Sequence, residues 1–189
     1  MAATRPAPAL LIVDMIGQFD YPGADRMAPS AVRAAGVARA VRDRFHRRGW
    51  PVVYANDNFA HWQSDFRELV AMAAGTPGAA GRIADVLEPR PEDHFVLKPK
   101  HSAFQATALP VLLAKLGVDR LVLAGMALES CILATAIDAN AREYRVAVAR
   151  DAVGGRAALR AATFKVLEGA KIATVLQSAQ VAAWCRRAR

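Results

Sequence analysis

Three reactive side chains each follow a short apolar run that predicts a buried strand. Asp14 comes directly after ALLIV, Lys98 directly after HFVL, and Cys131 lies a turn beyond LVLA. A cysteine nucleophile needs a base to take the thiol proton and a cation to hold the thiolate, and an Asp, Lys and Cys set supplies both. Taken singly, each residue has a structural explanation: a helix cap, a solvated lysine or an inert buried cysteine. Together they favour a site for nucleophilic catalysis.

The segment around Cys131 predicts a buried strand, a sharp turn and a helix. Leu121–Ala124 is an unbroken apolar run bounded by Gly125, as in a parallel strand that is covered on both faces. A helix N-terminus presents free N–H groups and the positive end of the helix dipole. Because Cys131 would lie in the first helical turn, we expect the pKa of its thiol to be lowered.

Strands and helices alternate along the whole chain. The predicted strands cover residues 9–13, 51–55, 94–97, 119–124, 144–149 and 172–175. A long helix is expected to begin at Pro29 and Ser30, and residues 75–92, rich in Gly and Pro, are expected to form a surface loop with one helical turn. With at most six helices, this alternation predicts one domain over residues 1–189. Its fold class is a three-layer α/β/α sandwich around a six-stranded parallel sheet, Rossmann-like, with ligands at the carboxyl ends of the strands.

Composition limits the partners. The net charge of +8 raises the question of nucleic acid, but the arginines are scattered and lack interleaved aromatic residues, so we expect no nucleic-acid binding. No apolar run is long enough for a membrane span, and the first residues do not form a signal peptide. We therefore expect a cytoplasmic protein, with Cys131 and Cys185 reduced.

Four blocks of sequence, taken in order, resemble the isochorismatase-like hydrolase superfamily, the cysteine hydrolases that include nicotinamidases, N-carbamoylsarcosine amidohydrolases and ureidoacrylate amidohydrolases. The blocks are ALLIVDMIGQF in the region of residues 10–19, then GTPG, EPRPED and LKPKHSAFQAT within 75–107, LVLAGMALESCILATAIDA over 121–139 and YRVAVARDAVG over 144–154. The resemblance covers nearly the whole chain. It implies the isochorismatase-like hydrolase fold and a catalytic triad at Asp14, Lys98 and Cys131.

The resemblance also implies a mechanism. Asp14 would take the thiol proton, Lys98 would stabilise the ionised pair, and Cys131 would attack an amide or ureido carbonyl to give a thioester that water hydrolyses. The backbone N–H groups of Ala127 and Cys131 would hold the oxyanion, with a cis peptide between Met126 and Ala127.

Departures from the family patterns bear on the substrate. Where many members have Thr-Asp before the cysteine, this chain has Leu128-Glu129, which predicts a more apolar pocket edge at Leu128. The loop at 56–61 lacks the Asp-x-His of metal-binding nicotinamidases, so we expect no metal, no cofactor and no nicotinamidase activity. True isochorismatases lack the cysteine, and Cys131 therefore argues against cleavage of a vinyl ether.

Four side chains on loops after the strands could line the pocket: Phe19, Asn58, Trp62 and His101. The alternative for Phe19 and Trp62 is core packing, and for His101 it is a surface or interface position. We predict a metal-independent cysteine hydrolase that cleaves a C–N bond of a small amide, ureido or carbamoyl compound. The alternatives are isochorismatase-type ether hydrolysis and a non-catalytic binding or assembly subunit.

Self-association is expected as well. The loop at 75–92 and the aromatic run Phe59, Trp62 and Phe66 would leave apolar surface near the pocket mouth, which on a monomer would be exposed to water. Members of the superfamily often form dimers or tetramers, and we expect a homo-oligomer.

Overall fold

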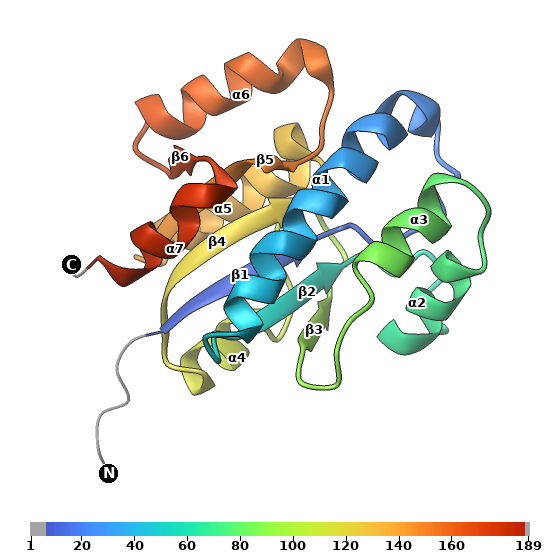
Figure 1. Cartoon of the computed structure of the whole chain (residues 1–189), viewed down its shortest axis with the longest axis horizontal. Helices are drawn as coiled ribbons and strands as arrows, with labels where there is room; N and C mark the ends of the chain where they lie inside the picture. Colours follow the sequence, from blue (N-terminus) through green and yellow to red (C-terminus); the bar gives the residue numbers. More distant parts are fainter. Residues whose placement is uncertain (1–6, 188–189) are drawn as a thin grey trace.

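Six parallel strands form the central sheet of the computed structural model, which describes residues 7–187 (Figure 1). Their order across the sheet is β3-β2-β1-β4-β5-β6, and all neighbours pair in parallel. The strands are β1 (Ala7–Val13), β2 (Val52–Asn56), β3 (His94–Leu97), β4 (Val118–Gly125), β5 (Arg145–Val153) and β6 (Thr174–Leu176). The predicted six-stranded parallel sheet is confirmed.

The chain changes direction across the sheet between β1 and β4. From β1 it runs outward through β2 to β3, and it then crosses back so that β4 pairs with the other side of β1. In open α/β sheets such a reversal leaves a crevice outside the carboxyl ends of the two strands, where ligands bind. Here the crevice lies beside Asp14, which follows β1, and the turn to Cys131, which follows β4.

Helices cover both faces of the sheet because successive side chains of each strand point to opposite faces. Leu10 and Ile12 of β1 belong to a core cluster that includes residues of α1, α3 and α7. Leu11 and Val13 belong to a second cluster, with residues of α4, α5 and α6. The helices are α1 (Ala24–His46), α2 (Phe66–Ala74), α3 (Ala79–Val86), α4 (Leu109–Lys115), α5 (Leu133–Ala141), α6 (Ala157–Gly169), α7 (Ser178–Arg186) and a short π-helical turn, η1 (Leu128–Ile132).

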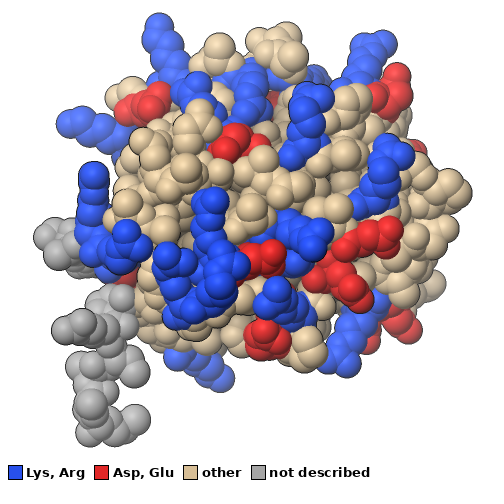
Figure 2. Space-filling model, in the orientation of Figure 1, with Lys and Arg blue, Asp and Glu red and all other residues tan. Residues whose placement is uncertain are grey.

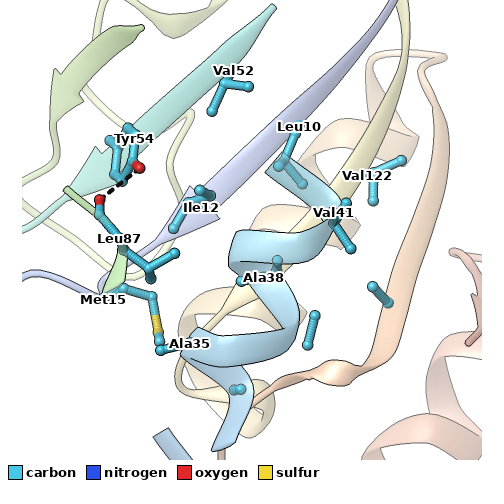
Figure 3. Close-up of a cluster of buried hydrophobic side chains, with 14 of the residues drawn as sticks. Leu10, Ile12, Met15, Ala35, Ala38, Val41, Val52, Tyr54, Leu87 and Val122 are labelled. Carbon is cyan, nitrogen blue, oxygen red and sulfur yellow. Dashed lines mark hydrogen bonds between the residues drawn. The ribbon is translucent and has the colours of Figure 1, made fainter. Parts of the chain in front are cut away.

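Small side chains allow α1 to lie close to the sheet. Ala38 faces the sheet near Leu10 and Ile12, and all three are fully buried (Figure 3). At the edge of this cluster the Tyr54 hydroxyl donates a hydrogen bond of 2.7 Å to the carbonyl of Leu87, so a buried polar group is satisfied where the apolar contacts end.

Two helices differ from the sequence prediction. α1 begins at Ala24 rather than at Pro29, because Ala24 and Met27 are buried and extend the helix before the proline. Residues 75–92 contain α3, an eight-residue helix, where one turn was expected. Its buried face, which includes Ile83, packs on α1 and α2. The described residues thus form seven α-helices, and the prediction of at most six was wrong.

Charged side chains are spread over the surface. Figure 2 shows Lys and Arg distributed across the visible face with Asp and Glu among them. Within residues 7–187, none of the helices combines the length and the apolar character that crossing a bilayer requires.

Candidate active site

Asp14, Lys98 and Cys131 meet at the carboxyl edge of the sheet. The Lys98 Nζ lies 2.7 Å from the Asp14 Oδ2 and 3.6 Å from the Cys131 Sγ. It also donates a hydrogen bond of 2.9 Å to the carbonyl of Lys100. The side chain of Lys98 is 3% exposed, so the lysine is a buried cation that holds a carboxylate and a sulfur atom together.

A glycine at the end of β4 brings Cys131 beside Asp14. Gly125 has a φ of 116°, and a Cβ on this residue would lie 2.1 Å from the carbonyl oxygen of Val13. The N–H of Met126 donates a hydrogen bond of 2.9 Å to the same Val13 oxygen, and the peptide between Met126 and Ala127 is cis, as expected. Any side chain at position 125 would separate the ends of β1 and β4.

The short turn η1 carries Cys131 and opens one backbone donor to the cavity. The carbonyl of Ala127 accepts the N–H groups of Ser130 and Ile132, each at 3.1 Å. Within the part of the chain that the structure describes, the N–H of Ala127 itself has no acceptor. Ala127 and Cys131 both line the cavity, where such a donor can face a reacting oxygen.

The pKa of the thiol is raised, and the prediction of a lowered value was wrong. The pKa of Cys131 is raised to about 11, mainly by burial and then by the negative charge of Asp14, while Lys98 acts in the opposite direction. A helix terminus is visible in the sequence, but the loss of solvent and the neighbouring carboxylate outweigh it. Cys131 is therefore a neutral thiol at rest, and it would need a base in order to act as a nucleophile.

Asp14 is placed to be that base. Burial raises its pKa above the ordinary carboxyl value, although the charge of Lys98 and, more weakly, the thiol of Cys131 oppose the shift. Burial opposes the charged form of Lys98, but Asp14 and Cys131 raise its pKa on balance, so the lysine stays protonated. A carboxylate with a raised pKa, fixed beside a thiol, can accept and return a proton.

A cavity of about 1340 Å³ opens over this cluster. Phe19, His101 and Ala127 line it together with the triad, and the continuous segment 17–23 between β1 and α1 forms one wall. Tyr21 and Glu129 also line the cavity, and neither was predicted to do so from the sequence. The position of Glu129 could have indicated this, because Glu129 is two residues from the cysteine in the same turn.

Three residues expected at the pocket do not line the cavity. Asn58 is buried and shapes its own loop: its side chain donates to the carbonyl of Ser64 and accepts the N–H groups of Ala60 and Trp62. Trp62 is 55% exposed, and Leu128 is fully buried in the core. The apolar edge expected at Leu128 is instead occupied by the charged Glu129.

The aromatic run contributes less exposed surface than expected. Phe66 is buried and stacks on Phe95 with ring centroids 5.0 Å apart, and Phe59 is half-buried and lines the cavity. Of the three aromatic residues named for this surface, only Trp62 is exposed, because Phe66, the first residue of α2, belongs to the core and Phe59 packs against it.

The side chains also bear on metal binding. Among residues 7–187, no three His, Cys, Asp or Glu side chains come together closely enough to hold a metal ion. Sites for zinc have three or four protein ligands.

Comparison with known proteins gives the family. The isochorismatase domain model matches residues 8–180. The maleamate amidohydrolase of Pseudomonas putida is 35% identical over 161 residues, covering 79% of this chain and 73% of the relative. The crystal structure of N-carbamoylsarcosine amidase from Thermoplasma acidophilum is 33% identical, with a TM-score of 0.70, and covers 91% of this chain and 96% of that one. Because the family model spans every strand of the sheet and the whole cluster, the chain belongs to the isochorismatase family, and its resemblance to the isochorismatase-like hydrolases is confirmed.

Proposed function

We propose that this enzyme hydrolyses a C–N bond of a small amide, ureido or carbamoyl compound through a thioester on Cys131. The observation that carries the proposal is the buried contact of Lys98 with both Asp14 and Cys131 at the floor of the cavity. Relatives named as a maleamate amidohydrolase and an N-carbamoylsarcosine amidase act on compounds of this kind.

The first half of the reaction forms the acyl-enzyme. As the Cys131 sulfur attacks the substrate carbonyl carbon, the thiol proton passes to the Asp14 carboxylate. The carbonyl oxygen becomes an oxyanion held by the N–H groups of Ala127 and Cys131, and Lys98 balances the negative charge that moves between sulfur and carboxylate. Asp14 then returns the proton to the nitrogen, the C–N bond breaks, and ammonia or an amine leaves.

The second half releases the acid. Water gives a proton to Asp14 and attacks the thioester carbonyl, and the C–S bond breaks as sulfur takes the proton back. No step needs a metal, and we expect activity to survive treatment with a chelator.

The test is a panel of small amides, ureides and carbamoyl compounds scored for released ammonia or amine. For any compound that turns over, acid quenching and mass spectrometry should find the acyl group on Cys131 and none on Cys185. Turnover with no acyl adduct on Cys131 at any quench time, or turnover of a vinyl ether alone, would contradict the proposal.

We also propose that the enzyme works in the cytoplasm as a homo-oligomer. Both cysteines are free, which suits a reducing compartment. Trp62 and Phe95, 55% and 46% exposed, leave apolar side chains on the surface that a second copy could cover. Light scattering at micromolar concentration is the test, and a mass of 20.3 kDa with full activity would rule out an obligate oligomer.

A further inference from the structure

A fourth side chain reaches the nucleophile. The Nδ1 of His101 lies 3.6 Å from the Cys131 Sγ, the same distance as the Lys98 Nζ. His101 is exposed, lines the cavity and lies three residues beyond Lys98, in the loop between β3 and α4. It has no part in the triad chemistry described above.

The loop that carries His101 is anchored on both sides of the imidazole. On one side the Lys98 Nζ donates to the carbonyl of Lys100 at 2.9 Å. On the other side the N–H of Ala103 donates to the Thr135 Oγ1 at 3.0 Å, and Thr135 is fully buried in α5, the helix that continues from η1. The loop is thus tied to the catalytic lysine and to the helix behind the cysteine, and these two anchors hold the imidazole near the sulfur.

Lys98 does not serve the sulfur alone, and the Ser130 Oγ, which also donates toward the sulfur, lies farther away than His101, at 3.8 Å. The ammonium group of Lys98 has three protons, and it contacts the Asp14 carboxylate, the Lys100 carbonyl and the Cys131 sulfur. Its charge is therefore shared. A sulfur anion in a buried position gains from every further hydrogen bond that it receives, since a bond to a charged acceptor is stronger than one between neutral groups.

We propose that His101 is a catalytic residue whose Nδ1–H donates a hydrogen bond to the Cys131 sulfur whenever that sulfur carries negative charge. This occurs as the thiol gives its proton to Asp14 and again as sulfur leaves the second tetrahedral intermediate. The imidazole keeps its own proton throughout, so the proton balance between Cys131 and Asp14 is unchanged. The kinetic part of this inference rests on the proposed function, whereas the contact with the thiolate does not.

Alkylation of Cys131 by iodoacetamide tests the inference without any substrate. The reagent is neutral, reacts with the thiolate, and the modified peptide identifies the cysteine. In His101→Leu and His101→Phe we expect the alkylation rate constant at fixed pH to fall roughly 10- to 100-fold, the effect of losing one hydrogen bond to a charged group. His101→Asn places an amide N–H near the position of Nδ1 and should recover most of the rate. His61→Leu, at an exposed histidine that does not line the cavity, is the matched control and should react as the wild type.

Two outcomes would overturn the inference: alkylation of His101→Leu and His101→Phe at the wild-type rate, or an equal loss in His101→Asn. His101 is exposed, so its replacement opens no core cavity, and a thermal unfolding curve for each variant separates misfolding from chemistry. If the alkylation effect appears but no amide or ureide turns over, the inference stands and the proposed function fails. If the His101 variants turn over substrate as the wild type does and their alkylation rates are unchanged, the proposed function stands and the inference about His101 fails.

Discussion

The two cysteines of the chain lie in very different surroundings. Cys131 and Cys185 are both free and buried, and burial raises their pKa to about 11 and about 12. Four arginines lower the pKa of Cys185, yet burial outweighs them all. Cys131 differs in having the Lys98 Nζ, the His101 Nδ1 and the Ser130 Oγ within 3.8 Å of its sulfur and the charge of Asp14 acting on it, beneath an open cavity. A nearby positive charge alone does not activate a thiol, whereas a proton acceptor in contact with it can.

The largest effect should come from removing each thiol in turn. Cys131→Ala should lower kcat/KM by about 1000-fold or more, because no other group can form the thioester. Cys185→Ala should leave kcat/KM unchanged. Because Cys185 lies in α7 against the core, this substitution should cost about 1 kcal/mol of stability. Steady-state kinetics and urea unfolding of both variants measure this. An active Cys131→Ala enzyme would remove the basis of the comparison.

Replacing the proton acceptor should have the next largest effect. Asp14→Asn keeps the shape of the side chain but cannot take the thiol proton, and kcat/KM should fall by about 100- to 10,000-fold. In the wild type, kcat/KM should decrease as the pH falls through the raised pKa of Asp14, because a protonated carboxyl accepts nothing. The pH profile of the residual activity in Asp14→Asn should lack this limb. Asp138→Asn, which alters a surface ion pair with Arg142, is the control and should retain the full profile.

A smaller effect is expected from the anchor behind the cysteine. Thr135→Val is close in shape but leaves the N–H of Ala103 without its acceptor, which should cost about 1–3 kcal/mol of stability. It should also loosen the loop of His101 and slow the alkylation of Cys131 severalfold. Thr163→Val is matched, because Thr163 is buried in α6 and donates only to the carbonyl of Leu159 in its own helix. Equal alkylation rates in the two variants would show that the bond from Ala103 to Thr135 does not affect the reactivity of the Cys131 sulfur.

The smallest effect concerns stability at high pH. The pKa of Cys185 is raised from 9.0 to about 12 on folding, so the folded state keeps a proton that the unfolded state loses. The stabilisation is complete below pH 9.0 and is lost as the pH rises toward about 12. The difference in the free energy of unfolding between the wild type and Cys185→Ala should therefore shrink from pH 8 to pH 10, roughly the lower part of this window. A difference that grows with pH would contradict the raised pKa.

The meeting of Asp14, Lys98 and Cys131 could be predicted because their positions depend on strand ends. Asp14 and Lys98 directly follow apolar runs, and Cys131 follows one after a glycine turn. Parallel strands bring these points to one edge of the sheet whatever the details of packing are. The order of strands, with β1 next to β4, then places Asp14 beside the turn of Cys131.

The rest of the site depends on contacts that have no periodic signal. Asn58 is drawn away from the cavity by three hydrogen bonds within its own loop, and such side-chain contacts to the backbone follow no spacing rule that could be read in advance. The nearness of His101 to the sulfur depends on the bond from Ala103 to Thr135, which joins residues far apart in sequence. The raised pKa of Cys131 could not be predicted either, because burial and the charge of Asp14 are properties of the folded chain.

The wall of the cavity has a consequence for engineering. Segment 17–23 is continuous in sequence, lies between β1 and α1, and contains no member of the triad. It can therefore be exchanged as a cassette, by transplanting the matching segment from a relative or by building a library confined to these positions. Selectivity would change from one variant to the next while the reactive centre stays the same, and screening for new amide substrates becomes a search over one short peptide.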